Sequence, residues 1–205
     1  MLTKLKTLAI AASLAALPIA QANAATQEVE GILTDGFITH IDAMVQMRIL
    51  DGKWDVDNAD TTALGAAFLF QTRGIEWPVG LQIGYGFAEN DDQNGEAELE
   101  ARDLLIGVMV PFGMPDKLNF DVGGGFSQTY LDITRKNVGV GEQRKEEIRG
   151  AGVYVRGALR YPISYACDVS AAAMYSYAPA DSALAGDTDI NAGGIGIYGG
   201  IGLRF

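Results

Sequence analysis

The chain has 205 residues, a formal net charge of −11 and a sequence pI near 4.4. Its length suits one domain, and its acidity argues against nucleic acid as a partner, because nucleic-acid binding depends on a surplus of Lys and Arg. The single cysteine, Cys167, excludes an intrachain disulfide, and the single histidine, His40, excludes a His-rich metal site.

The N-terminus has the features of a secretory signal peptide, which we assign to residues 1–24. Lys4 and Lys6 provide the positive charge, residues 8–17 form the apolar segment, and Ala22-Asn23-Ala24 is a small-x-small cleavage site. No other segment approaches the roughly 18–20 apolar residues that a spanning helix needs. The sequence therefore predicts an exported protein that can cross a membrane only with strands.

After a short periplasmic lead-in at residues 25–36, residues 37–205 are predicted to form one β-barrel domain. Each expected strand has about the 9–11 residues that a tilted strand needs to cross a bilayer. The eight expected strands are residues 37–49, 62–72, 79–88, 102–112, 118–131, 150–161, 167–177 and 193–205.

Within these strands, large apolar residues alternate with small or polar ones. Val153 and Val155 share one face of their strand, whereas Arg156 and Arg160 share the other. Short connections alternate with long polar ones, which we place at residues 50–61, 89–101, 132–149 and 178–190. This pattern predicts an all-β fold: an eight-stranded antiparallel up-and-down transmembrane β-barrel with short periplasmic turns and longer extracellular loops.

The last strand carries the most specific signal. One face is almost entirely glycine, and the chain has Tyr198, Gly200, Leu203 and a terminal Phe205. This ending resembles the terminal assembly signal of bacterial outer-membrane β-barrels, and the whole domain resembles the small OmpA/OmpX-like, porin-like barrels. The resemblance implies a Gram-negative outer-membrane location and recognition by the barrel insertion machinery. Residues 175–193 are also similar to a stretch of the YfaZ family of small outer-membrane proteins.

The inward faces are predicted to carry a network of nearly balanced charge. Buried charges are costly unless they are paired, so we expect these side chains to form ion pairs inside the barrel. The expected network consists of Asp42, Asp103, Asp121 and Asp168 with Arg48, Arg156, Arg160 and Arg204. Such a network favours a plugged lumen over an ion pathway.

His40 and Asp42 lie two residues apart on one face and could orient a general base for Ser127, Ser170 or Ser176. A structural histidine inside the lumen is the favoured interpretation. We therefore expect no catalytic residues, no enzyme activity and no cofactor.

Two long loops are acidic, and weak binding of divalent cations there is an open alternative to simple solvation. Asn90-x-Asp92-x-Asn94-Gly95 imitates the start of an EF-hand, but Ala101 occupies the position of the bidentate Glu, so we assign no metal site. Basic residues of the third loop could contact lipopolysaccharide phosphates. The acidic residues are Asp51, Asp55, Asp57, Asp60, Glu89, Asp91, Asp92, Glu96, Glu98 and Glu100, and the basic ones are Arg135, Lys136, Arg144 and Lys145.

The function favoured by the sequence is therefore an integral outer-membrane protein with a structural or surface-interaction role and outer-membrane lipid and lipopolysaccharide as its surroundings. A narrow channel for small or apolar solutes is one alternative, and a lipid-modifying enzyme of the outer membrane is another.

Overall fold

A computed structural model describes residues 36–50, 62–91, 97–113, 117–135, 144–182 and 188–205. Within these residues, no helix is long and apolar enough to cross a membrane. The predicted signal peptide and all of the lead-in except Gly36 lie outside the described residues. The elements are β1 (Phe37–Leu50), β2 (Thr62–Gly74), β3 (Gly80–Asp91), β4 (Ala97–Phe112), β5 (Asn119–Arg135), β6 (Arg144–Pro162), β7 (Cys167–Tyr177), β8 (Pro179–Ser182), β9 (Thr188–Asn191) and β10 (Gly194–Arg204).

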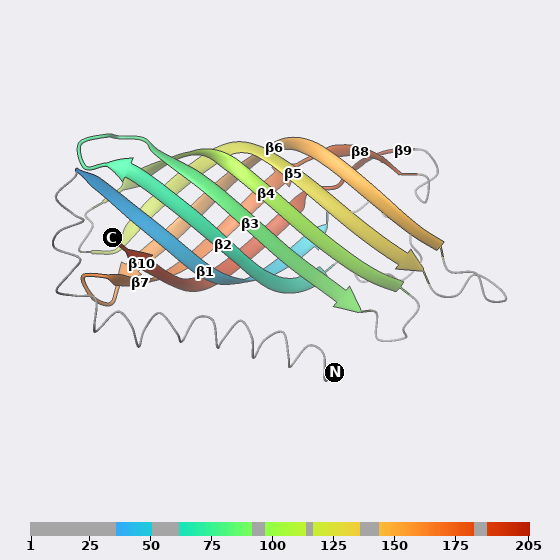
Figure 1. Cartoon of the computed structure of the whole chain (residues 1–205), viewed down its shortest axis with the longest axis horizontal. Helices are drawn as coiled ribbons and strands as arrows, with labels where there is room; N and C mark the ends of the chain where they lie inside the picture. Colours follow the sequence, from blue (N-terminus) through green and yellow to red (C-terminus); the bar gives the residue numbers. More distant parts are fainter. Residues whose placement is uncertain (1–35, 51–61, 92–96, 114–116, 136–143, 183–187) are drawn as a thin grey trace.

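Eight of these strands close into a barrel in the order β1-β10-β7-β6-β5-β4-β3-β2, and β8 and β9 form a separate two-stranded sheet (Figure 1). All neighbouring strands are antiparallel, and the barrel closes where β1 meets β10, with Ala43 opposite Ile201. The predicted all-β, eight-stranded, up-and-down barrel is therefore confirmed.

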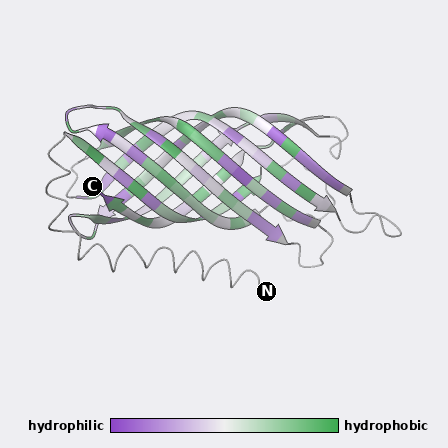
Figure 2. Cartoon of the chain, in the orientation of Figure 1, coloured by the Kyte–Doolittle hydropathy of each residue, from purple (hydrophilic) through white to green (hydrophobic). Residues whose placement is uncertain are grey.

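The two faces of the barrel wall differ in the way that the alternation predicts. Along β7, Val169 and Tyr175 are exposed on the outside, whereas Asp168 and Ser170 are buried inside. Figure 2 shows the same alternation of apolar and polar residues along the other strands. An outer surface of large apolar side chains around a polar interior is the arrangement of barrels that face lipid.

The two ends of the barrel are built differently. At one end, which we call the turn end, short connections join β2 to β3, β4 to β5 and β6 to β7, and the C-terminus lies beside the start of β1 (Figure 1). Thr39 and Phe205 exchange two backbone hydrogen bonds there, of 3.0 and 2.9 Å. The opposite end, the loop end, carries the long connections and the hairpin β8–β9.

The predicted long loops are wrong at their flanks, where β3, β4, β5 and β6 continue as strands. The alternation continues with them, because Ile133 and Ile148, both within the predicted loop at residues 132–149, point inward and are buried. They belong to an apolar group at the loop end that we call the loop-end cluster. Its members are Leu50, Ala101, Leu131, Ile133, Ile148, Ile190 and Ala192, with Leu99 and Ala180 packed against them. Burial of this group favours extended strands over open loops.

The hairpin β8–β9 likewise replaces part of the predicted loop at residues 178–190. Asn191 fixes the point where the hairpin leaves the barrel wall, because its Oδ1 accepts hydrogen bonds from the backbone N–H of Ala178 at 2.7 Å and of Gly193 at 2.9 Å. Gly194 has a φ of 132°, which residues with a side chain rarely adopt. These features hold Ile190 and Ala192 within the loop-end cluster.

Candidate functional site in the barrel lumen

Arg160, on β6, is the centre of the polar network near the turn end, and 2 % of its surface is exposed. Its Nη1 and Nη2 donate to the two carboxylate oxygens of Asp42 at 2.7 and 2.6 Å, and its Nε donates to Asp121 at 2.7 Å. Asp168 lies 3.4 Å from Nη1, and Nη2 also donates to the side-chain oxygen of Gln71. One guanidinium therefore joins β6 to β1, β2, β5 and β7.

A chain of amides extends this network across the barrel. Gln71 donates to Gln82 at 3.2 Å, and Gln82 donates to the hydroxyl of Tyr154 at 2.6 Å. Glycines provide the space: a Cβ at Gly202 would collide with the carboxylates of Asp42 and Asp168, and a Cβ at Gly123 would lie 2.5 Å from the amide nitrogen of Gln82. The glycine face of β10 thus accommodates the charged groups.

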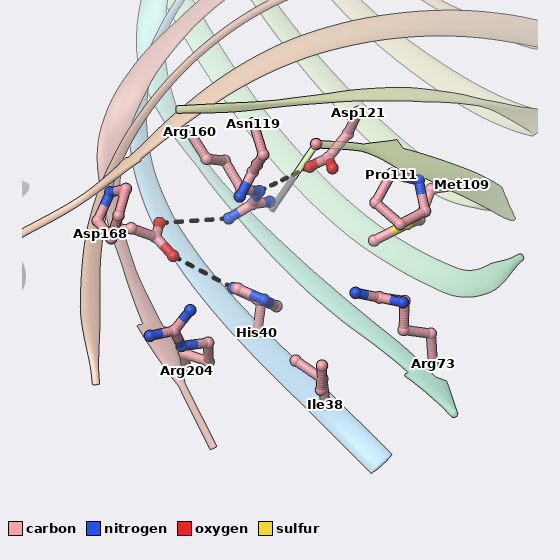
Figure 3. A pocket seen from close by; sticks show the side chains of 12 residues that line it. Ile38, His40, Arg73, Met109, Pro111, Asn119, Asp121, Arg160, Asp168 and Arg204 are labelled. Carbon is pink, nitrogen blue, oxygen red and sulfur yellow. Dashed lines mark hydrogen bonds and ion pairs between the residues drawn. The ribbon is translucent and has the colours of Figure 1, made fainter. Parts of the chain in front are cut away.

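His40 and Arg204 lie at the rim of the turn end, beside the Arg160 network (Figure 3). His40 Nδ1 is 3.3 Å from an oxygen of Asp168, and Arg204 donates from Nε and Nη2 to the backbone oxygen of Tyr165 at 2.9 and 2.7 Å. A small cavity of about 30 Å³ opens here between His40, Arg73 and Asn119. Arg204 therefore belongs to the rim, whereas the other predicted lumen charges are buried.

A second ion pair lies toward the loop end. Arg48 on β1 pairs with Asp103 on β4, and Asp103 also accepts a hydrogen bond of 2.7 Å from the hydroxyl of Thr129. Arg48 Nη2 donates to the backbone oxygen of Ala192 at 3.2 Å, which connects this pair to the hairpin region. Arg48 and Asp103 are both almost completely buried.

An apolar layer separates the two ionic groups. It consists of Met44, Ala67, Leu69, Leu105, Tyr154, Ala158, Ala172, Met174 and Tyr198. Arg156 projects into this layer between Tyr154 and Ala158 of β6, and it is 3 % exposed. Among the described residues its Nη2 has no hydrogen-bond partner. The structure thus brings six of the eight predicted charges into two ionic groups and leaves Arg156 and Arg204 outside them.

The serine arrangement considered for catalysis is not assembled. His40 lies against Asp168 rather than Asp42. The Ser176 hydroxyl faces the backbone oxygen of Gly194 at 3.5 Å, and the hydroxyls of Ser127 and Ser170 have no hydrogen-bond partner among the described residues. A nucleophilic serine needs a base within hydrogen-bond reach, so these residues do not form a triad.

No group of three His, Cys, Asp or Glu residues suited to a metal ion occurs in the part of the chain that the structure describes. The first acidic loop, residues 51–61, and residues 92–96 of the second lie outside it. Glu89, Glu98 and Glu100 lie on the extended ends of β3 and β4 rather than in a loop.

Sequence reasoning missed the neutral members of the network. The expected network does not include Gln71, Tyr154 or Thr129. Their signal is available in the sequence: an amide, phenol or hydroxyl on the inward face of a strand needs a hydrogen-bond partner when it is buried. Which partner each finds depends on the stagger between strands, which the sequence alone does not define.

Solved structures provide the comparison for this fold. No protein-family model matches the sequence, and no curated protein is similar to it. The chain is similar to Neisserial surface protein A, with 13 % identity, a TM-score of 0.51 and coverage of 83 % of this chain and 96 % of that one. It is also similar to the attachment invasion locus protein of Yersinia pestis, with 10 % identity, a TM-score of 0.53 and coverage of 83 % and 99 %.

A major outer membrane protein of Thermus thermophilus gives 9 % identity, a TM-score of 0.54 and coverage of 82 % of this chain and 99 % of that one. The chain therefore shares the fold of small outer-membrane β-barrels over most of the length of each. Identities this low show the fold alone, and the local similarity to the YfaZ family stays a prediction.

Proposed function

We propose that this chain is a non-enzymatic, integral protein of a bacterial outer membrane, with a closed lumen and a structural or surface-interaction role. The observation that carries the proposal is the inverted polarity of the barrel. Leu81, Ile106 and Phe126 are among more than twenty large apolar side chains exposed on the outside, whereas Asp42, Asp121 and Arg160 are buried inside. A water-facing barrel would expose the charges, and a lipid-facing one exposes the hydrocarbon.

The contents of the lumen support its closure. An eight-stranded barrel has an interior just wide enough for side chains, and Arg160, its three carboxylates and Gln71 reach across it from five strands. Above them lie the apolar layer and the Arg48–Asp103 pair. The cavity at the turn end, about 30 Å³, has room for only about two waters.

The loop end supports a role at the cell surface. Above the outward Phe87 and Tyr130, the walls carry charged residues such as Glu100, Arg102 and Asp132, with Arg102 within 2.5 Å of Glu100 and 3.4 Å of Asp132. Charged side chains that lie beyond a band of outward aromatic side chains are typical of the lipid headgroup region. Lipopolysaccharide and outer-membrane lipid are therefore the expected surroundings. Two structural neighbours, Neisserial surface protein A and the attachment invasion locus protein, have names that agree with such a role.

A narrow channel for small or apolar solutes is the second candidate. The loop-end cluster favours it, because this cluster lines the inside of the barrel with apolar side chains. It is the weaker candidate, since the same side chains pack against the hairpin and the ionic groups below them join opposite walls.

Bilayer conductance separates these two functions. The mature protein is refolded, its heat-modifiable migration on a gel establishes the folded barrel, and single insertions are recorded in a planar bilayer. A closed lumen gives insertion without steady current, and a liposome uptake assay gives no entry of an apolar dye. A steady current or dye entry through the folded protein would replace the closed-lumen function with the channel.

A further inference from the structure

The outer face of the barrel stays apolar as far as its short turns. Before β3, the outward position of Leu81 is preceded by Val79 and then by Trp77 in the turn, and all three side chains are exposed. The other two turns continue their strands in the same way. The exposed outward series there are Val122, Phe120 and Leu118 at the start of β5, and Leu159, Tyr161, Ile163 and Tyr165 at the end of β6. The apolar outer surface therefore extends onto the turns.

The loop end differs, because its outward residues become charged while the strands still continue. On β4, the exposed Leu104 is preceded at alternate positions by Arg102 and Glu100, which form a surface ion pair. On β6, Arg149 and Glu147 take the corresponding outward positions and are well exposed. Outward charges mark the level at which a strand leaves the hydrocarbon of a bilayer. The loop end reaches that level within its strands, whereas the turn end does not.

Trp77 is held in a fixed position in the turn between β2 and β3. Its ring packs edge-on against Phe37, with ring centres 6.0 Å apart, and it covers Gly74, where an added Cβ would lie 2.9 Å from the ring. The backbone N–H of Trp77 donates to the oxygen of Gly74 at 3.0 Å. Trp77 is nevertheless 59 % exposed. An ordered but uncovered indole, apolar with one N–H donor, suits the boundary between acyl chains and headgroups.

The turn between β6 and β7 presents Tyr165 in a similar way. The backbone N–H groups of Ile163 and Ser164 both donate to the oxygen of Cys167, at 2.9 and 3.0 Å. The guanidinium of Arg204 donates twice to the backbone oxygen of Tyr165, at 2.9 and 2.7 Å. These bonds fix the main chain, while Tyr165 itself is 94 % exposed. A phenol likewise combines an apolar ring with a polar group, so this side chain also suits a lipid–water boundary.

The charges of the turns limit how deeply they can lie. Glu76 and Lys117 are the charged residues of these three turns in the part of the chain that the structure describes. Each is next in sequence to a large exposed apolar residue, Trp77 or Leu118. Long charged side chains can place their carbon atoms along apolar surface and their charge among headgroups. The surface that covers these turns must therefore offer apolar and polar groups at one level, as a phospholipid leaflet does.

We propose that the three short turns form an anchor seated at the headgroup–acyl boundary of a phospholipid leaflet, with Trp77, Leu118 and Tyr165 as its contact residues. The occupant is lipid rather than a periplasmic protein, because the apolar surface of the turns is continuous with the apolar wall of the barrel and is not a separate patch. The anchor rests on the proposed outer-membrane function and adds that the turn end does not project into the periplasm.

The fluorescence of single tryptophans tests the anchor. The chain has two tryptophans, so Trp54→Phe leaves Trp77 as the only reporter. The protein is refolded into phosphatidylcholine vesicles, either with brominated acyl chains or with iodide on both sides of the membrane. Trp77 should lose intensity to the brominated lipid and be shielded from iodide. Quenching by iodide without quenching by brominated lipid would overturn the proposal.

The other two turns are tested in a Trp54→Phe, Trp77→Phe background. Leu118→Trp and Tyr165→Trp each place one reporter at an exposed position, so neither change removes a buried contact. Both reporters should be quenched by brominated lipid and not by iodide. Iodide quenching of either reporter would contradict an anchor made of three turns.

Two further reporters in the same background separate the possible failures. Phe126→Trp lies on the exposed outer wall and should respond to brominated lipid, whereas Glu147→Trp lies at the charged loop end and should respond to iodide. Lipid quenching at Phe126 combined with iodide quenching at Trp77 would leave the barrel in the membrane and remove the anchor alone. Iodide quenching at Phe126 as well would overturn the outer-membrane function itself.

Discussion

The turn-end half and the loop-end half of the lumen differ in the interactions that stabilise their buried side chains. Near the turn end, Arg160 is shared by three carboxylates and an amide from four other strands. Near the loop end, Arg48 has one carboxylate, and the interior also contains the apolar loop-end cluster. One half is therefore joined through a single shared charge, whereas the other combines one ion pair with an apolar cluster.

The largest loss of unfolding free energy is expected when the shared positive charge of Arg160 is removed. Arg160→Met leaves Asp42, Asp121 and Asp168 buried together without their cation, which should cost at least about 3–5 kcal/mol of unfolding free energy. Urea titration of the barrel in vesicles measures it. Arg149→Met is the matched control, since this exposed arginine makes a 3.7 Å surface contact with Glu147 and lies 5.7 Å from the centre of the Tyr130 ring, and its loss should change stability by less than about 1 kcal/mol. Equal effects of the two changes would contradict the central role of Arg160.

The next largest loss of unfolding free energy is expected when apolar packing is disrupted, chiefly at the loop end. Ile133→Ala removes a buried side chain from the loop-end cluster and should cost about 2–4 kcal/mol, with part of the cost from the cavity that remains. Ile106→Ala, on the outward face of the preceding strand, should cost less because its side chain is exposed on the outer surface and its loss leaves no internal cavity. The same urea titration compares them. A smaller loss for Ile133→Ala than for Ile106→Ala would contradict the packed interior of the loop end.

The glycine face of β10 provides a test of steric fit at the turn end. Gly202→Ala places a methyl group against the carboxylates of Asp42 and Asp168 and should cost about 1–3 kcal/mol. Gly199→Ala on the same strand meets no atom within 4 Å, and it should be close to neutral. Heat-modifiability and unfolding midpoints report both. Tolerance of Gly202→Ala equal to that of Gly199→Ala would show that the carboxylates are not held where the structure places them.

The smallest effect is expected when the loop-end ion pair is replaced as a unit. Arg48→Met with Asp103→Leu removes both charges, and replacing a buried pair by apolar groups is often neutral to within about 1–2 kcal/mol. Asp103→Leu alone leaves Arg48 buried without its carboxylate and should be worse than the double variant. A double-mutant cycle measures the difference, and a double variant less stable than either single one would contradict the pairing.

The barrel itself was predictable because its signal is local and repeated. Alternation along each strand assigned Asp42, Arg160 and Asp168 to the interior before any contact was known, and strand β7 has the predicted bounds, Cys167–Tyr177. The loop flanks were missed because polar outward residues such as Glu98 and Glu147 were given more weight than inward Ile133 and Ile148. Those outward residues are polar because they lie beyond the part of the outer surface that carries large apolar side chains. The strands themselves continue there.

The pairing inside the lumen was less predictable. The stagger between strands decides which carboxylates reach Arg160 on β6. One of them, Asp42, comes from β1, which is not a neighbour of β6 in the sequence. Charge balance over the whole lumen suggested one network, whereas depth along the barrel divides it into two. An apolar layer with Leu69, Leu105 and Met174 lies between them.

The central claim is that the outward residues contact lipid while the inward ones contact only the protein, and three consecutive alanines on β7 test it most directly. Ala171 and Ala173 are exposed on the outside, and Ala172 is buried inside. In a Cys167→Ser background, a spin label is attached to a cysteine at each position in turn, and its collisions with oxygen and with a water-soluble nickel chelate are measured in vesicles. Labels at 171 and 173 should collide with lipid-dissolved oxygen and not with nickel, whereas the label at 172 should be immobile and shielded from both. Nickel access at 171 and 173 would contradict the account.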